Sequence, residues 1–398
     1  MTLKEELEIL RGEPIAVCTG NPLDIPCIET SDSEKLCKHP IVSVNMITYN
    51  HEPYIREAIE GVMMQQTDFE FELVIGEDAS TDRTREICFE YQKRYPDKIR
   101  VLWWHENLRK VNHPAGCNGA RTRAHCRGEF IALCEGDDYW IDPLKLQKQV
   151  DAMRKFPSVG YCVTDSLVKC EVPRNHPRLK NFVIREWRDD DTFVFDMGAY
   201  KPGFVPKDEF WKNRIYYPRT ATVMYRVSDL NEARKTLEIL NWKMKIGDVL
   251  LWNALPFVSD AYYIPDITAV YRLNAGGASF SIQKKELRKN AYFELDIIEY
   301  YFDAVKKEYP AATYKKCAVL TKRIEYLASS KCGLSGIIKL LEHSVFTDAV
   351  KMRRFYWMIY KILIRMGIRI QPSSFDRWVC LARMPVTILK KLYRRSGK

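Results

Sequence analysis

The 398-residue chain lacks the short motifs that mark several common enzyme classes. It has no GxxxxGK(S/T) phosphate loop, no HExxH and no GxSxG, which excludes the commonest NTPase, zinc-protease and serine-hydrolase arrangements. None of the twelve cysteines belongs to a Cys-x-x-Cys pair, and many stand in apolar runs, as Cys134 and Cys162 do. We therefore expect buried thiols in a reducing compartment rather than a disulfide framework.

Long apolar runs are also absent. No stretch of eighteen uninterrupted apolar residues occurs, so the sequence predicts no ordinary transmembrane helix. The segment Met1–Leu7 carries two acids and no apolar core, unlike a secretory signal. We expect a cytoplasmic protein, or one that is peripheral on the cytosolic face of the inner membrane.

The net charge of +10 comes from the end of the chain. Residues 339–398 contain fourteen Lys and Arg against three acids, which accounts for the whole excess. In residues 352–369 and 386–395 bulky apolar residues are mixed with cations, a composition that suits a helix lying on an anionic membrane surface. A C-terminal helical bundle with solvated cations would have the same composition. No nucleic-acid-binding motif accompanies the tail, so we expect no nucleic-acid partner.

A regular alternation of strands and helices follows an N-terminal extension at residues 1–39. Strands are expected at residues 41–48, 71–76, 99–104 and 129–134, with helices at 54–66, 81–95 and 118–127 between them. This rhythm predicts an α/β fold with a mostly parallel sheet and helices on both faces. After Asp165 the pattern becomes irregular up to about residue 218, strands resume at 219–226 and 267–272, and residues 284–398 read as a basic helical C-terminal region.

Polar clusters follow three of the expected strands. They are Thr48-Tyr49-Asn50, Glu77-Asp78 and Glu135-Gly136-Asp137-Asp138. In open α/β sheets, ligands bind beyond the carboxyl ends of the strands, so these clusters predict a common binding edge.

The acidic cluster at residues 135–138 is the sharpest of the three. Three carboxylates in four residues repel one another unless a cation lies between them, and Mg²⁺ or Mn²⁺ prefers such oxygen ligands. A solvated acidic turn before a helix near Pro143 would explain the same residues, as acids favour helix N-termini. Likewise Glu77–Asp82 can be a ligand site or a loop whose Asp and Ser cap the next helix, with Ser80 or Thr81 expected as the N-cap.

Taken together, the clusters resemble the family-2 glycosyltransferases. The segments that carry the resemblance are residues 42–50, 77–82, 128–140 and 142–149, in matching order and spacing, with weaker matches to about residue 280. The resemblance implies the nucleotide-sugar-binding, Rossmann-like GT-A fold over residues 40–283. It also implies an inverting transfer of a sugar from a nucleotide-sugar to an acceptor hydroxyl.

The resemblance assigns donor roles residue by residue. Thr48, Tyr49, Asn50 and Asp78 match positions that hold the base and ribose. Asp137 and Asp138 match the metal-binding Asp-x-Asp motif, and imply Mn²⁺ or Mg²⁺ as cofactor. The leading position of that motif is Glu135 here, with Gly136 beside it; both are expected to lie at the donor sugar, although the longer Glu side chain departs from the family pattern.

The second half of the domain is expected to supply the remaining catalytic groups. Asp248, in Lys245-Ile-Gly-Asp248, matches the family's general base, which removes the acceptor proton. On its own, Asp248 could equally be a helix N-cap. Arg272, before a flexible Gly pair, matches the segment that closes over the donor, where it would neutralise the leaving diphosphate; Asn274 stands where the family often has His.

The sequence therefore predicts a metal-dependent glycosyltransferase of bacterial polysaccharide-biosynthesis type. The donor expected first is a UDP-sugar, and the acceptor a glycan or a lipid-linked molecule. The alternative is a catalytically inactive nucleotide-sugar-binding or scaffold protein, against which the presence of Asp137, Asp138 and Asp248 argues.

Overall fold

The computed structural model describes residues 21–108, 118–174, 184–188, 191–195, 201–207, 218–240 and 255–273. These residues all belong to one compact unit, Glu13–Leu287. The other unit, Met1–Gly12 with Arg288–Lys398, lies outside the described residues. So does the whole basic helical region predicted for residues 284–398.

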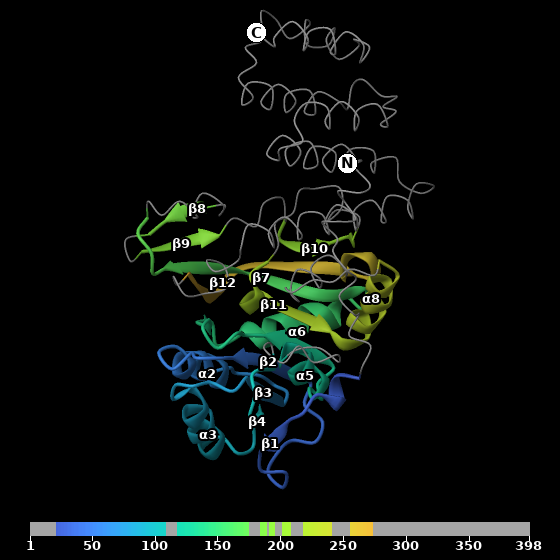
Figure 1. The fold of residues 1–398 in the computed structure, drawn as a ribbon. Helices are drawn as coiled ribbons and strands as arrows, with labels where there is room; N and C mark the ends of the chain where they lie inside the picture. Colours follow the sequence, from blue (N-terminus) through green and yellow to red (C-terminus); the bar gives the residue numbers. More distant parts are fainter. Residues whose placement is uncertain are drawn as a thin grey trace, which may run out of the picture. The chain divides into compact units, whose positions relative to one another are not determined.

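Four parallel strands form one half of the sheet, in the order β4-β3-β2-β5 (Figure 1). They are β2 (Val42–Thr48), β3 (Phe71–Glu77), β4 (Ile99–Trp103) and β5 (Phe130–Leu133). The helices between them are α2 (Ile55–Met63), α3 (Thr84–Arg94) and α5 (Asn118–Ala124). The predicted α/β fold is confirmed, and each of these elements lies within a few residues of its expected bounds.

Helices α2 and α3 cover one face of this half of the sheet, and α5 lies on the other (Figure 1). The apolar stripe of α2 packs in one buried cluster with the alternate residues of β2 that point toward it. On the opposite face, α5 approaches β3 so closely that a Cβ on Gly76 would lie 1.9 Å from Thr122 Oγ1. Asn118 Nδ2 donates to the Gly76 carbonyl at 2.7 Å, so a glycine is required where helix and strand meet.

Beyond β5 the sheet is mixed. β11 (Val223–Arg226) lies antiparallel between β5 and β7 (Val159–Cys170), and β12 (Asp260–Leu273) runs parallel to β7. β12 also pairs with the two-residue β6 (Tyr139–Trp140) and with β10 (Gly203–Val205). The remaining elements are β1 (Ile28–Thr30), β8 (Ile184–Trp187), β9 (Thr192–Phe195), α6 (Lys145–Lys155), α8 (Val227–Leu240) and two 3-10 turns, Pro22–Asp24 and Thr220–Thr222.

The expectation that regular structure ends at Asp165 was wrong, because β7 continues to Cys170. Thr164, Asp165 and Ser166 are polar, yet all three residues are buried inside the strand. Thr164 Oγ1 lies 2.6 Å from Thr268 Oγ1, and the Tyr263 hydroxyl donates to Asp165 at 2.8 Å. Polar residues continue a strand where the neighbouring strand satisfies them.

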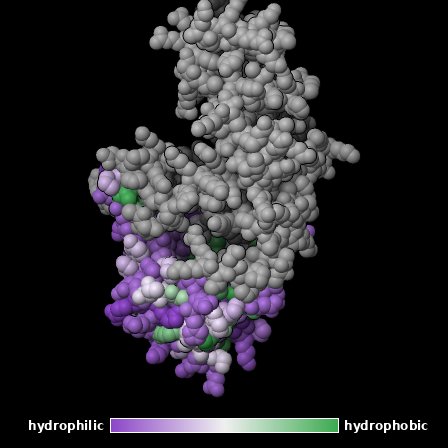
Figure 2. Space-filling model, in the orientation of Figure 1, coloured by the Kyte–Doolittle hydropathy of each residue, from purple (hydrophilic) through white to green (hydrophobic). Residues whose placement is uncertain are grey.

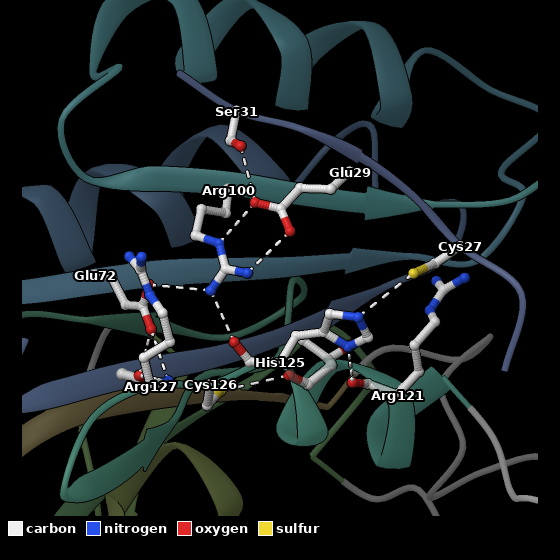
Figure 3. A network of polar contacts seen from close by, with 11 residues as sticks. Cys27, Glu29, Ser31, Glu72, Arg100, Arg121, His125, Cys126 and Arg127 are labelled. Atoms are coloured by element: carbon white, nitrogen blue, oxygen red, sulfur yellow. Dashed lines mark hydrogen bonds and ion pairs between the residues drawn. The ribbon is translucent and has the colours of Figure 1, made fainter. Parts of the chain in front are cut away.

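The amino ends of the parallel strands carry a closed network of charges (Figure 3). β1 pairs antiparallel with β4 and brings Glu29 onto Arg100, with N···O distances of 2.8 and 2.9 Å. Arg100 also contacts Glu72 at 3.2 Å, and Arg127 binds the same carboxylate at 2.6 Å. Ser43 donates to Glu72 at 2.6 Å, so this carboxylate, 1% exposed, is fully hydrogen-bonded.

The face of the described residues seen in Figure 2 is largely hydrophilic, with isolated apolar spots. Large apolar side chains that are exposed are few among the described residues: Leu23, Ile28, Ile141, Leu144 and Phe204. None of the helices in the described ranges combines the length and apolar character needed to cross a bilayer.

Candidate functional site

The three predicted clusters meet at one edge of the sheet. β3, β2 and β5 are adjacent parallel strands, so their carboxyl ends lie side by side. The backbone N–H of Asp78 donates to the Thr48 carbonyl at 3.1 Å, and that of Gly136 donates to the Ile47 carbonyl at 2.9 Å. Backbone hydrogen bonds therefore join the acidic loop and the β3 end to the end of β2.

The loops after β2 and β3 are locked together. Asn50 adopts a left-handed backbone conformation, with φ of 54°, and its Oδ1 accepts from the Thr81 N–H at 2.8 Å. Its own N–H donates to Ser80 Oγ at 3.0 Å. Helix α3 begins at Thr84, with Asp82 Oδ1 accepting from the Thr84 N–H at 3.0 Å, so neither Ser80 nor Thr81 caps it as predicted. These loops use their polar groups to hold each other.

Asp78 is buried at the end of β3, 7% exposed. Its Oδ1 accepts from the Leu108 N–H at 2.8 Å, and its carbonyl accepts from Asn107 Nδ2 at 2.9 Å. The carboxylate therefore fixes the segment that follows β4, the next strand of the sheet.

Gly136 is the point of closest approach between the acidic loop and the end of β2. A Cβ on Gly136 would lie 2.7 Å from Thr48 Oγ1 and 2.9 Å from His51 Nδ1. Both of these side-chain atoms are buried and have no hydrogen-bond partner within the described residues. Only glycine allows the loop to lie against them.

Asp138 is enclosed by the protein. It is 1% exposed, Oδ1 accepts from the Arg272 backbone N–H at 2.9 Å, and Oδ2 has no partner within the described residues. Burial, and then the neighbouring Asp137 carboxylate, hold the pKa of Asp138 well above its usual range. Two adjacent acids thus have different surroundings, and Asp138 faces the interior.

Asp137 is the more open of the two acids, with 23% of its side chain exposed. Its Oδ2 lies 3.9 Å from His51 Nε2. Burial lowers the pKa of His51, while the Asp137 carboxylate acts in the opposite direction. A carboxylate and an imidazole therefore face each other at the carboxyl edge of the sheet.

Arg272 holds the acidic loop from behind. Its Nη1 donates to the Asp137 carbonyl at 2.7 Å, and Nη2 donates to the Glu57 carboxylate. The guanidinium lies between two aromatic rings, 4.3 Å from the centroid of Tyr139 and 5.0 Å from that of Tyr54. Its side chain is 3% exposed, so contact with a diphosphate would require it to leave these partners.

Asp137 and Asp138 are the carboxylates that would hold the divalent cation implied by the family resemblance. Among the described residues, no group of three or more His, Cys, Asp and Glu side chains could hold a metal ion. Mg²⁺ and Mn²⁺ sites that also bind substrate phosphates need only one or two protein carboxylates. The open carboxylate of Asp137, with the buried and only half-partnered Asp138 beside it, fits a site of that kind.

The structure brings most of the predicted site residues together. Nine of them lie at or behind the edge of the sheet formed by the carboxyl ends of the parallel strands: Thr48, Tyr49, Asn50, Asp78, Glu135, Gly136, Asp137, Asp138 and Arg272. The predicted base, Asp248, and Asn274 lie outside the described residues. Sequence reasoning missed His51, Tyr54, Glu57 and Tyr139; their closeness in sequence to Asn50 and Asp138 was the one available indication.

A family comparison agrees with this geometry. Residues 43–206 match the sequence profile described as Glycosyl transferase family 2. That range contains the three strand ends and the acidic loop. This part of the chain is therefore similar to the family-2 glycosyltransferases. The resemblance proposed from the sequence motifs is thereby confirmed.

Curated relatives match part of the chain. A protein of Mycobacterium tuberculosis, named only as uncharacterised, is 46% identical over 121 residues, which are 30% of this chain and 34% of the relative. TuaG of Bacillus subtilis, whose name provisionally assigns it to teichuronic acid biosynthesis as a glycosyltransferase, is 33% identical over 128 residues, 31% of this chain and 47% of its own. The matches thus span between a third and a half of these relatives.

A solved structure shares the fold of the glycosyltransferase domain. TarS of S. aureus, residues 1–349 in complex with UDP-GlcNAc, superimposes with a TM-score of 0.50 at 17% identity. The match covers 81% of this chain and 82% of that chain. At this level of identity the similarity supports the GT-A fold alone.

Proposed function

We propose that the protein is an inverting glycosyltransferase that moves a sugar from a nucleotide-sugar to an acceptor hydroxyl. The pathway we propose is the assembly of a cell-surface polysaccharide or glycolipid. One observation carries the proposal: β2, β3 and β5 bring their polar ends together inside the family-2 match, at the edge where α/β sheets bind ligands. The name of TuaG, which is 33% identical over 128 residues, refers to teichuronic acid biosynthesis.

The proposed donor site divides between two parts of this edge. Thr48, Tyr49, Asn50 and Asp78 would hold the base and ribose, with the locked loops after β2 and β3 as a rigid platform. Glu135 and Gly136 would lie at the donor sugar, in the loop that Gly136 allows to lie directly against the end of β2. A UDP-sugar is the first donor to test, because TarS was crystallised with one.

We propose that Asp137 holds a divalent cation, Mn²⁺ or Mg²⁺, with the diphosphate completing the coordination. Such a cation would supply charge stabilisation for the leaving diphosphate. Asp138 and Arg272 would support this cation site by fixing the loop at residues 135–138. The Arg272 side chain donates to the Asp137 carbonyl, and the Arg272 backbone N–H donates to the Asp138 carboxylate. Through these contacts Arg272 would position the donor site without touching the donor.

Asp248 is the proposed general base. It would take the proton from the acceptor hydroxyl as the oxygen attacks the anomeric carbon opposite the leaving diphosphate, so an α-linked donor would give a β-linked product. The support for Asp248 is the sequence motif. The proposed acceptor is a glycan or a lipid-linked molecule, and the basic tail at residues 339–398 would bring the enzyme to an anionic membrane surface.

Separate measurement of binding and turnover tests this function. Donor binding is followed by thermal shift with UDP-sugars and Mn²⁺, and turnover by release of UDP. Asp248→Asn is expected to bind donor as the wild type does and to release at least 100-fold less UDP, since general-base catalysis contributes about 10²–10⁴. The exposed Asp97→Asn is the matched control. Full turnover by Asp248→Asn would remove that residue as the base; donor binding without turnover by the wild type would favour a scaffold.

A further inference from the structure

His51 is the residue at this edge that neither the motifs nor the family pattern assigned. It follows Asn50 directly, and its Nε2 lies 3.9 Å from the Asp137 Oδ2 atom. About a fifth of each side chain is exposed, 22% for His51 and 23% for Asp137, so both reach the same part of the surface.

The backbone and ring of His51 are held by α2, α3 and the acidic loop. Its N–H donates to Thr84 Oγ1 at 2.8 Å, and its carbonyl accepts from the N–H groups of Tyr54 and Ile55 at 2.9 Å each. The ring meets Tyr54 edge-on at 6.4 Å, and its Nδ1 atom lies beside Gly136. The imidazole is therefore directed at Asp137 by its surroundings, as a ligand on a rigid element should be.

We infer that His51 Nε2 is a second protein ligand of the divalent cation proposed for Asp137. The inference rests on the proposed function and specifies its metal site. Two atoms bound to one ion at about 2.0–2.2 Å lie roughly 3–4 Å apart, which the 3.9 Å separation already meets. Two protein ligands leave the other positions to diphosphate oxygens, in agreement with the lack of a three-residue cluster in the described ranges.

A second observation points to a ligand at the same place. Thr48 Oγ1, in a residue 3% exposed, and His51 Nδ1 both lie beside Gly136 and have no hydrogen-bond partner within the described residues. A buried hydroxyl and a buried ring nitrogen without partners are unfavourable in a site that has only structural roles. A donor bound through the His51–Asp137 pair would lie next to these two atoms.

A nitrogen ligand changes which cation the site prefers. Mg²⁺ is a hard ion that favours oxygen ligands, whereas an imidazole nitrogen binds Mn²⁺ and, more tightly, the transition metals that follow it in the affinity series. An Asp–His pair should therefore bind Mn²⁺ and Co²⁺ more tightly than Mg²⁺ in the presence of nucleotide. The preference for transition metals, rather than binding as such, is the specific signature of His51.

The test measures metal affinity on the full-length protein. Mn²⁺ binding is followed by electron paramagnetic resonance with UDP and, in a second arm, with GDP, and Mg²⁺ affinity is obtained by competition. In His51→Gln and His51→Asn we expect the ratio of Mn²⁺ to Mg²⁺ affinity to fall about 10-fold, with His39→Gln, an exposed histidine, as control. Because the ratio is taken within one variant, partial unfolding leaves it unchanged.

The outcomes separate the two levels of the proposal. If the His51 variants keep the wild-type ratio while Asp137→Asn loses Mn²⁺, His51 is not a ligand and the glycosyltransferase site stands. If the wild type binds no Mn²⁺ with either nucleotide, the inference and the metal-dependent function both fail. A fall in the ratio confined to the His51 variants supports the pair.

Discussion

The two ends of the same parallel strands differ in how completely their charges are paired. At the amino end, the buried Glu72 carboxylate accepts from Ser43, Arg100 and Arg127. At the carboxyl end, Asp137 and Asp138 stand next to each other, and Asp138 Oδ2 has no partner within the described residues. The amino end is a finished structural network, whereas the carboxyl end has the unmatched charge that a ligand-binding site needs.

The largest expected effect is on stability, at the amino end. Glu72→Gln should lower the free energy of unfolding by about 3–5 kcal/mol, because it removes the buried carboxylate shared by Arg100 and Arg127 and leaves Glu29 as the one anion for two cations of the network. Urea unfolding measures this. Glu70→Gln is the matched control, since the Glu70 side chain is 65% exposed and lies 3.6 Å from Lys98; it should change stability by less than about 0.5 kcal/mol. Equal effects of the two variants would contradict the structural role of the network.

At the carboxyl end the expected effect is on binding. Asp137→Asn should weaken Mn²⁺-dependent donor binding about 100-fold, roughly 2.7 kcal/mol, because it removes the open carboxylate. Without donor, its melting temperature should stay the same or rise, since the charge beside the buried Asp138 is gone. Thermal shift with and without donor measures both, and Asp97→Asn is the control. A large loss of stability without loss of binding would reverse the contrast between the two ends.

Lys145, the first residue of α6, should make stability depend on pH. It is fully buried, donates to Gln149 at 2.6 Å and lies 4.6 Å from the Trp140 ring; burial lowers its pKa to about 7. Between the folded value and the ordinary 10.5, the unfolded chain binds a proton that the folded chain does not, so stability rises with pH. We expect about 1.4 kcal/mol per pH unit from pH 7.5 to 8.5.

Urea unfolding at pH 7.5, 8.0 and 8.5 measures that slope. Lys145→Met should remove it, while Lys148→Met, a lysine whose side chain is 35% exposed, should retain it. The measurements stop below pH 9 because of buried thiols such as Cys162, whose pKa is raised to about 12 by burial. Above pH 9 these thiols lose their proton in the unfolded chain but not in the folded one, so stability falls as pH rises. An identical slope in Lys145→Met would show that Lys145 is protonated in both states.

The smallest effect is expected in the locked loops. Asn50→Gly keeps the left-handed backbone but loses the hydrogen bond to the Thr81 N–H, at a cost of about 1 kcal/mol. Asn50→Ala also has to adopt a positive φ, which costs about 1 kcal/mol more. Comparison of the two variants by urea unfolding separates backbone strain from the hydrogen bond. Equal stability of the two would mean that the φ of 54° is not strained.

The sequence was most informative where regular repeats coincide with strand ends. Apolar runs alternating with amphipathic stretches predicted the four parallel strands, and parallel pairing then required their polar ends to meet. The acidic loop at residues 135–138 was found for that reason. The order of strands, helices and polar clusters along the chain was enough to locate this part of the site.

What the sequence could not give depends on contacts between distant segments. Asp137 and Asp138 are equivalent in sequence, yet Asp138 is 1% exposed and accepts from the backbone of Arg272, 134 residues later. Arg272 was predicted at the diphosphate, but the rings of Tyr54 and Tyr139 surround it. His51 was overlooked because its role depends on its distance to Asp137, which no local pattern encodes.

The central claim is that the carboxyl end of the parallel strands binds a nucleotide-sugar through a cation at Asp137. A thermal-shift titration of the wild type and Asp137→Asn with UDP-, GDP-, TDP- and CMP-sugars, in Mn²⁺ and in EDTA, tests it most directly. We predict that one nucleotide class raises the melting temperature of the wild type in Mn²⁺, and that EDTA or Asp137→Asn abolishes the rise. A rise that survives both would contradict the metal site, and no rise with any donor would contradict the assignment of this edge as the donor site.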